Sequence, residues 1–116
     1  MDTEAVTGDG LLRALTALGN PHRLRVIAAL VKRTTYVSEL ARELEISRPL
    51  LQVHLRKLES AGLVTSTLKL SDEGKAMKFY EVTDFSLHLT PAMIAEAAKT
   101  ISGLTEEPGQ AEKGNG

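Results

Sequence analysis

The chain contains no cysteine in its 116 residues. Disulfide bonds, thiolate metal ligands and thiol redox chemistry are therefore excluded. Tryptophan is also absent and aromatic residues make up only 3% of the chain, which leaves little surface for stacking on unpaired bases and argues against a single-strand binder. No apolar run approaches the roughly 20 residues that a membrane-spanning helix needs.

The chain also lacks the marks of an enzyme and of an exported protein. It has no Gly-rich phosphate loop, no cysteine nucleophile and no spacing of Ser, His and an acid that exceeds chance as a sign of a catalytic triad. The early apolar segment at residues 11–19 is interrupted by Arg13 and has no basic leader, unlike a signal peptide. We therefore expect a cytoplasmic protein that is not an enzyme and has no membrane partner.

Both ends of the chain are poor in large apolar residues. Residues 1–8 are largely polar, and residues 105–116 hold Pro, Gly and charged residues. Such segments cannot repay the entropy lost on ordering. We predict a disordered N-terminus at 1–8, one folded domain at 9–104 and a disordered tail at 105–116.

Helical spacing of apolar residues predicts three helices in the first part of the domain. The first ends at Gly19, and the second begins with Asn20 as N-cap and Pro21 at the first helical position. The expected apolar faces are Leu11, Leu12, Leu15 and Leu18 on the first helix, Leu24, Ile27, Ala28 and Val31 on the second, and Val37, Leu40, Ala41 and Leu44 on the third.

Residues 37–64 read VSELARELEISRPLLQVHLRKLESAGLV, which is an apolar-periodic helix, a tight connection and a further helix. Ser47 is a good N-cap for that further helix, and Ala61-Gly62 ends it. On a wheel at 100° per residue, its core face comprises Leu51, Leu55 and Leu58. This is the layout of a helix-turn-helix, in which one helix braces and the next enters a DNA groove.

The outward side of the second of these helices mixes cationic, amide and apolar side chains. Arg and Lys pair with phosphates, the Gln52 amide fits an adenine edge, and Val53 fits a thymine methyl. The predicted DNA-binding face comprises Ser47, Arg48, Pro49, Gln52, Val53, Arg56 and Lys57. The alternative is an ordinary solvated helix face in a generic bundle.

Two strand-like segments follow, at residues 63–70 and 78–83, with turn residues between them. Two strands after a helix-turn-helix form a wing, and we assign Lys75 and Lys78 to contacts with the DNA backbone, although acids at the wing tip weaken that assignment. The predicted fold is mainly α with a small β-hairpin: a winged helix-turn-helix in the order of four helices, two strands and a fifth helix.

The net charge of −1 is unevenly distributed. Residues 22–69 hold nine Lys or Arg and four acids, a net charge of +5, whereas residues 1–21 carry −2 and residues 70–116 carry −4. The positive charge therefore coincides with the predicted DNA-binding segment, where it can pair with phosphates.

The segment LGNPHRLRVIAAL, followed by residues 37–64 and the strand pair, resembles the ArsR/SmtB family of bacterial winged helix-turn-helix regulators. The resemblance covers about residues 10–102 and includes His54-Leu55 in the recognition helix. It implies a transcription regulator of a bacterial promoter that binds an inverted repeat in double-stranded DNA. It also implies a homodimer built from the first and last helices, and an effector that in many such proteins is a metal ion.

The first and last helices offer more apolar surface than a domain of this size can cover. Such a surface must meet a partner or remain an exposed patch. The predicted dimer interface comprises Leu11, Leu12, Leu15, Leu18, Met93, Ile94, Ala97, Ala98 and Ile101.

The metal patterns of the family are incomplete in this chain. The cysteine pair of the brace helix is missing, and the last helix with its approach offers one His. Asp84, His88 and Glu96 remain as possible ligands, and oxygen and nitrogen donors suit nickel or zinc better than a soft metal. A dimer would supply a second His, and simple packing of His88 is the alternative.

Four further questions stay open at this point. His54 is assigned to packing or to a phosphate contact, and His22 to the helix surface or cap. The near-neutral net charge and the acidic wing tip allow a competing interpretation, an interaction protein whose DNA binding or signal response depends on a second protein. Repressor and activator look alike in sequence.

Overall fold

A computed structural model describes residues 7–103 of the chain. These residues divide into two compact units, of which Ala14–Phe85 form one and the described residues before and after them form the other. Most of the two predicted tails, residues 1–6 and 105–116, lies outside the described residues, so the predicted domain boundaries stay a prediction.

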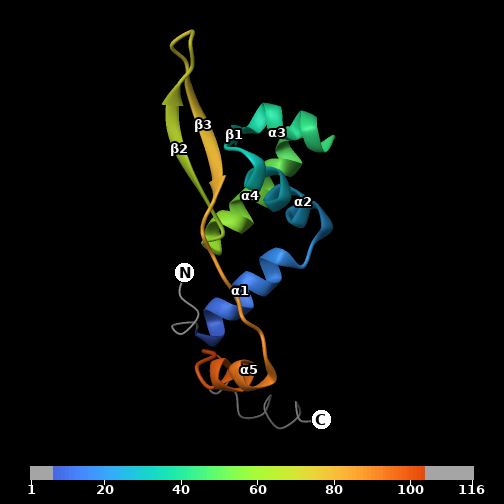
Figure 1. Ribbon diagram of the computed structural model, residues 1–116, viewed down its shortest axis with the longest axis vertical. Coiled ribbons are helices and arrows are strands. Elements are labelled where there is room, and N and C mark those ends of the chain that lie inside the picture. Colours follow the sequence, from blue (N-terminus) through green and yellow to red (C-terminus); the bar gives the residue numbers. More distant parts are fainter. Residues whose placement is uncertain (1–6, 104–116) are drawn as a thin grey trace. The chain divides into compact units, whose positions relative to one another are not determined.

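Five helices and three strands make up the described part of the chain. Their order is α1 (Gly8–Leu18), α2 (Pro21–Lys32), β1 (Thr35–Tyr36), α3 (Val37–Leu44), α4 (Arg48–Ser60), β2 (Val64–Leu70), β3 (Ala76–Val82) and α5 (Pro91–Ala98) (Figure 1). The predicted order of four helices, a hairpin and a last helix is confirmed, and no helix of residues 7–103 has the length and apolar character to cross a membrane.

The helix starts follow from short polar side chains that accept hydrogen bonds from the first free backbone N–H groups. The Asn20 side chain accepts from the backbone N–H of His22 at 2.8 Å, and Ser47 Oγ accepts from that of Leu50 at 3.2 Å. Proline occupies the first turn of both α2 and α4. The N-caps predicted at Asn20 and Ser47 are therefore confirmed.

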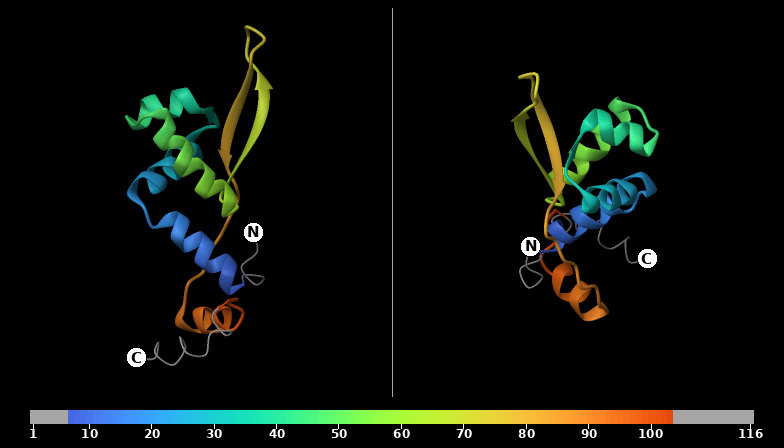
Figure 2. Two further views of the ribbon diagram at one scale, coloured as in Figure 1. Left: turned by 180° about the vertical axis from the view of Figure 1, so that it is seen from behind. Right: turned by 45° about the horizontal axis from the view of Figure 1, so that its top comes forward.

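The three strands form one antiparallel sheet in the order β1-β3-β2. The sequence prediction missed β1, because two residues are too few to show an alternating pattern; Thr35 pairs with Tyr80 and Tyr36 with Phe79. Figure 1 and both views in Figure 2 show the turn of the β2–β3 hairpin projecting beyond the helices α2, α3 and α4 of the same unit.

The core of the Ala14–Phe85 unit is aliphatic, with one buried tyrosine, Tyr80, from β3. Its most deeply buried side chains, each 0% exposed, are Val26, Leu40, Leu51, Leu55, Leu58 and Leu63. This packing connects α2, α3 and α4 to the base of the hairpin and thereby holds the helix-turn-helix against the sheet.

The predicted apolar face of α2 was wrong except at Ile27, which is half-buried and packs against the core. Its buried residues are Val26, Ala29 and Leu30, whereas Leu24 and Val31 are 54% and 67% exposed. The cause is that apolar residues fill almost the whole second half of α2, so helical spacing alone fits more than one face.

The other unit brings the first turn of α1 against the end of α5. Gly8 N–H donates to Thr100 Oγ1 at 2.7 Å, and the Asp9 carboxylate accepts from the N–H and the hydroxyl of Ser102 at 3.0 and 2.6 Å. The bond from the Ser102 hydroxyl, followed by that from its N–H, lowers the pKa of Asp9. A Cβ on Gly8 would collide with the Ala97 carbonyl and the Ile101 side chain.

We expect Gly8→Ala to lower the free energy of unfolding by about 1–3 kcal/mol, the usual cost of forcing an atom into a filled space. Gly10→Ala is the matched control, because a Cβ there meets only the Thr7 hydroxyl at 3.1 Å. It should leave stability unchanged or raise it by up to about 1 kcal/mol, since Ala favours a helix. Urea unfolding compares the two variants, and equal stabilities would contradict the close packing of α1 on α5.

Candidate nucleic-acid interface

Helix α4 separates a buried face from an exposed face. Leu51, Leu55 and Leu58 are 0% exposed and His54 is 5% exposed. On the opposite side Val53 is 40% exposed, and Arg56 and Lys57 are also exposed. This rotation is the one predicted from the wheel, and the predicted face is exposed except at Gln52, which is half-buried.

Three open surface hollows adjoin α4. One is lined by Val53, Arg56, Lys57, Glu59 and Ser60, and the second by Val37, Arg48, Pro49 and Gln52. The third joins the start of α3 to the hairpin and is lined by Tyr36, Val37, Ser38, Arg48, Met77 and Lys78. Arg48 lines two of them, so this residue of the first turn of α4 lies close to the start of α3 and to β3.

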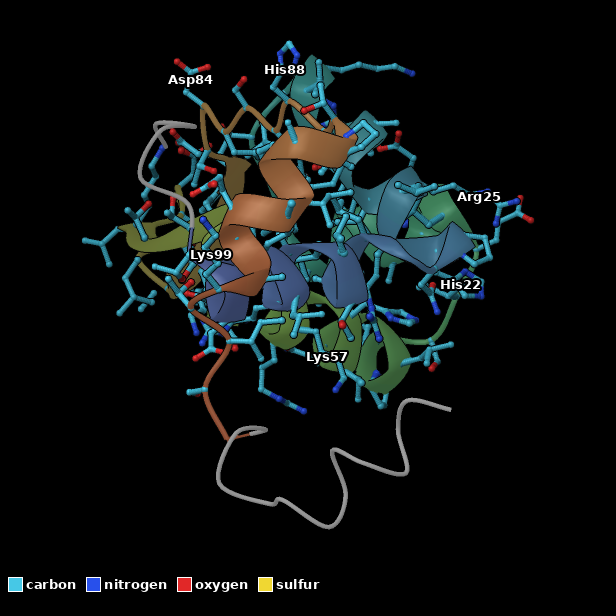
Figure 3. All side chains as sticks on the ribbon, turned by 90° about the horizontal axis from the view of Figure 1, so that it is seen from below. His22, Arg25, Lys57, Asp84, His88 and Lys99 are labelled. Atoms are coloured by element: carbon cyan, nitrogen blue, oxygen red, sulfur yellow. The ribbon has the colours of Figure 1, made fainter. Side chains whose placement is uncertain are left out.

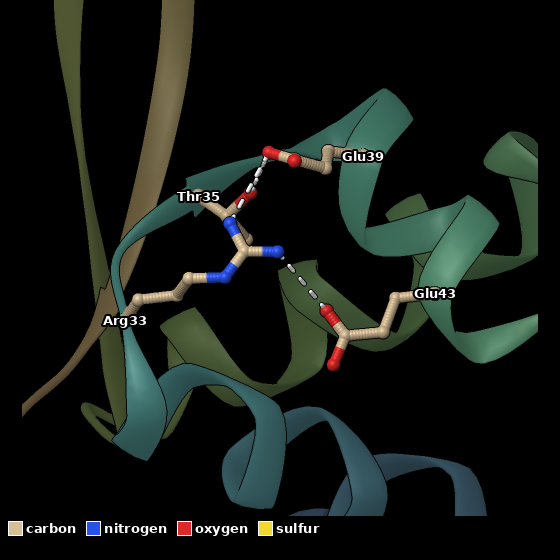
Figure 4. A network of polar contacts seen from close by, with 4 residues as sticks. All are labelled: Arg33, Thr35, Glu39 and Glu43. Carbon is tan, nitrogen blue, oxygen red and sulfur yellow. Dashed lines mark hydrogen bonds and ion pairs between the residues drawn. The ribbon is translucent and has the colours of Figure 1, made fainter.

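A polar network holds the brace helix α3 against the end of α2 (Figure 4). The Thr35 hydroxyl, 2% exposed, donates to Glu39 at 2.9 Å, and Arg33 contacts Glu39 at 3.3 Å and Glu43 at 3.5 Å. The hydrogen bond from Thr35, followed by that from Arg33, lowers the pKa of Glu39. This network was not predicted from the sequence; its signal was a pair of Glu residues four apart on one helix, preceded by an Arg.

The hairpin turn is closed by its own backbone and by one serine. Ser71 N–H donates to the Lys75 carbonyl at 2.8 Å, and Ser71 Oγ accepts from Lys75 N–H at 3.1 Å. Gly74 has a φ of 83°, which suits glycine in this turn. Lys75 is therefore held at an ordered turn, next to the exposed acids Asp72 and Glu73.

The strand register places the wing lysines on two faces. Lys78 pairs with Leu68 and Lys69 with Met77, and neighbouring pairs alternate between faces. Lys78 lies 5.8 Å from the Tyr80 ring centroid, on the face whose base is buried, whereas Lys69 lies 5.2 Å from that of Phe79 on the other face. The predicted contact Lys78 thus shares its face with Leu68, which is 70% exposed.

His54 is part of the protein interior. Arg23 Nε donates to its Nδ1 at 3.0 Å, and the His22 ring centroid lies 5.3 Å from its own. Burial is the main cause that lowers the pKa of His54, followed by the charges of Arg23 and His22. Of the two roles left open for this residue, packing fits its burial, because a residue 5% exposed offers almost no surface to a phosphate.

The predicted metal ligands are distributed over both units. Asp84 belongs to the Ala14–Phe85 unit, whereas His88 and Glu96 belong to the other. His88 is exposed and points away from the ribbon in Figure 3, and Glu96 forms an ion pair with Lys99 at 3.0 Å. Residues 7–103 contain no group of three or more His, Cys, Asp or Glu side chains arranged to hold a metal ion.

The predicted dimer residues differ in how far the chain itself covers them. Leu11 and Ala97 are each 5% exposed and offer no surface to a second copy, because each faces the interior of its own chain. Leu12 is 49%, Leu15 38% and Ile94 45% exposed. The remaining residues of that set, Leu18, Met93, Ala98 and Ile101, are half-buried or exposed.

Comparison with known proteins gives the same assignment as the geometry. The family model described as bacterial regulatory protein, arsR family, matches residues 20–66. An uncharacterized HTH-type transcriptional regulator of Methanocaldococcus jannaschii is 41% identical over 78 residues, which cover 67% of this chain and 81% of that protein. The residues matched by the family model include the helix-turn-helix and the start of β2.

Solved structures share the fold. A transcriptional regulator homologue from Pyrococcus horikoshii is 27% identical with a TM-score of 0.54, over 84% of this chain and 92% of that one. Reduced HlyU from Vibrio cholerae is 25% identical with a TM-score of 0.55, over 78% and 84%. A homodimeric winged helix-turn-helix DNA-binding domain from Mycobacterium bovis, 23% identical with a TM-score of 0.55 over 64% of each chain, supports the fold alone.

The fold and the comparisons thus lead to the same family. The structure has a brace helix, a recognition helix with an exposed basic face and a hairpin wing, and the matched family and relative are helix-turn-helix regulators. The chain belongs to the arsR family of bacterial regulatory proteins: it is a DNA-binding transcription regulator with a winged helix-turn-helix fold, and not an enzyme.

Proposed function

We propose that this regulator binds an inverted-repeat operator in a promoter as a homodimer, with α4 in the major groove and the hairpin on the adjoining backbone. The observation that carries the proposal is the exposed face of α4. It combines cations with one amide and one aliphatic side chain on a helix whose other face is anchored in the core. A helix so anchored can enter a groove without losing its packing.

The side chains of that face divide by their chemistry into two roles. Arg48, Arg56 and Lys57 are exposed cations that pair with phosphates and supply affinity. Gln52 and Val53 supply sequence preference, through an adenine edge and a thymine methyl. Ser47 and Pro49 lie at the start of the helix, where backbone N–H groups also favour a phosphate.

The wing adds cations beside the recognition helix. Lys78 shares a surface hollow with Arg48, so both can approach one DNA strand. Lys75 is held at the hairpin turn, where it can reach the backbone further along the duplex. The acids Asp72 and Glu73 would be repelled by phosphate, which favours contact through the lysines alone.

A homodimer would supply the second recognition helix that an inverted repeat requires. Its support in this chain is the exposed apolar side chains Leu12, Leu15 and Ile94 on the first and last helices. The M. bovis domain of the same fold is homodimeric. The competing interpretation, a winged-helix protein that depends on a second protein, gains no support from the family match.

The identity of the effector stays open, and a nickel or zinc site stays a prediction. With no cluster of three ligands among residues 7–103 of one chain, the set of Asp84, His88 and Glu96 would need ligands from a second copy. Two copies would supply two His88 imidazoles, and water or carboxylates would complete the shell.

We expect two substitutions on α4 to weaken DNA binding in different ways. The operator is first selected from random duplex DNA with the wild-type protein, and affinity is then measured by fluorescence anisotropy at several salt concentrations. Gln52→Ala should change the preferred sequence, with a loss of about 1–3 kcal/mol at one base pair. Arg56→Ala should weaken all sequences alike and lower the slope of log affinity against log salt by about one.

Arg25→Ala is the matched control, because Arg25 is an exposed arginine on α2 that lies on another side of the unit from Lys57 in Figure 3. It should keep the wild-type affinity. If Gln52→Ala and Arg56→Ala bind like this control, α4 is not the recognition helix.

We expect sedimentation at micromolar concentration to give twice the chain mass of 12.5 kDa. Placing a charge in the proposed interface, as in Leu12→Glu combined with Ile94→Glu, should yield monomers because a buried unpaired carboxylate is costly. Leu68→Glu, at an exposed leucine of the wing, is the control and should remain a dimer. A wild-type monomer that still binds the inverted repeat would contradict the proposed assembly.

For the metal, we expect nickel or zinc titrated by calorimetry to bind the wild-type protein and the His22→Ala control, but not His88→Ala. The affinity should fall in acid, since a ligating imidazole must be deprotonated. Binding that survives His88→Ala would move the site elsewhere, and no binding by the wild type would show that the signal is not one of these metals.

A further inference from the structure

One guanidinium connects three helices of the Ala14–Phe85 unit. Arg23 lies in the first turn of α2, and its Nε donates to His54 Nδ1 in the middle of α4 at 3.0 Å. Its Nη1 reaches the carbonyls of Thr16 and Ala17 in the last turn of α1 at 3.3 and 3.4 Å. The last turn of α1 has no basic residue of its own, so Arg23 provides its cationic end.

This arrangement fixes the tautomer of the neutral His54 imidazole. Because Nδ1 accepts a hydrogen bond, the neutral imidazole carries its proton on Nε2. Nε2 is buried and has no hydrogen-bond partner within the described residues. Between His54 and the rest of residues 7–103, the one hydrogen bond of the ring is thus the bond from Arg23, which exists only while Nδ1 is unprotonated.

We propose that Arg23 is a positioning residue for DNA binding: through His54 it fixes the recognition helix against α1 and α2, and protonation of His54 releases it. The inference rests on the proposed role of α4 in reading the operator. No side chain of the predicted DNA-binding face takes part in this contact, since His54 and Arg23 lie on the inner side of α4.

Protonation acts on the contact in two ways. A proton on Nδ1 removes the acceptor, and it places a second positive charge 3.0 Å from the guanidinium nitrogen. The charged or titratable groups that act on His54 are Arg23 and His22, both from α2. Within the described residues, α3 and β2, which also pack on α4, add no charge that shifts it.

The direction of the pH effect follows from the lowered pKa of His54. The unfolded chain takes up this proton near the ordinary imidazole value of about 6.5, whereas the folded chain resists it. The pair therefore contributes its full stability above about pH 6.5 and loses it as pH falls through the lowered pKa. Operator affinity should fall in the same direction, because α4 is then no longer held in one position relative to α1 and α2.

A loss of operator affinity in acid is opposite to the effect expected from general electrostatics. Protonating an exposed histidine adds positive charge, so acid ordinarily strengthens the attraction of a protein to DNA. A weakening in acid requires a histidine whose neutral form is needed, and among the three histidines only His54 is buried.

The test measures operator affinity by fluorescence anisotropy from pH 8 to pH 5 at constant ionic strength. The wild-type protein should lose roughly tenfold in affinity, the factor expected when a hydrogen bond to a charged group is lost. In His54→Asn the amide oxygen takes the place of Nδ1 and accepts from Arg23 without titrating, so the profile should be flat. His22→Asn is the matched control: it should keep the size of the wild-type loss, with a midpoint at slightly higher pH because the charge of His22 no longer acts on His54.

Two further variants test the same contact if the His54→Asn protein fails to fold. Arg23→Gln keeps a donor but removes the charge, so the midpoint of the affinity loss should move to higher pH. His54→Leu fills the space without an acceptor, so it should bind roughly tenfold more weakly at pH 7.5 and lose nothing more in acid. Urea unfolding at each pH shows which variants are folded.

An affinity that rises in acid, or a wild-type loss that persists in His54→Asn, would overturn the proposal. Failure of the proposed function is a separate result: the wild-type protein would then select no DNA at pH 7.5. In that case NMR titration of the His54 ring and the pH dependence of unfolding in wild type and His54→Asn still decide whether Arg23 holds the neutral imidazole.

Discussion

The rotation of α4 about its own axis is the constraint on which the rest of the interface depends. Leu51, Leu55 and Leu58 are fully buried, and a helix with three leucines in the core has no freedom to turn. A turn of 100°, one residue, would expose leucines whose burial contributes about 1.5–3 kcal/mol each. The outward direction of Arg56 and Lys57 is therefore a consequence of apolar packing, whereas the proposed role of the Arg23–His54 bond is to fix where α4 lies relative to α1 and α2.

Helix α2 determines where the two helices of the motif lie. Arg23 at its start reaches α4 through His54, and Arg33 directly after its end reaches Glu39 and Glu43 on α3. The contacts of Arg33 are half-exposed, and such ion pairs contribute little to stability. Their effect is geometric: they select one position of each helix among those that the aliphatic core would tolerate.

Local patterns predicted the local features. Asn20 and Ser47 were recognised as N-caps, and the faces of α4 were recognised from spacing, because these depend on neighbouring residues in the sequence. The buried face of α2 was not predicted correctly, since an almost continuous apolar run has no single period. The Arg23–His54 bond joins residues 31 apart, so no local pattern contains it, and β1 exists only through its pairing with β3.

The charge distribution explains why a second copy matters to such a regulator. In the proposed complex one chain would direct few cations toward DNA, namely Arg48, Arg56, Lys57, Lys75 and Lys78, and its wing also carries Asp72 and Glu73. Proteins with roughly 6–10 phosphate contacts owe much of their affinity to them, a number that one copy would not reach and two copies would. Because the rest of the chain is acidic, non-specific attraction to DNA should be weak. Affinity would then depend on both α4 helices engaging together, and any signal that tilts one of them relative to its own α2 would be felt at both half-sites.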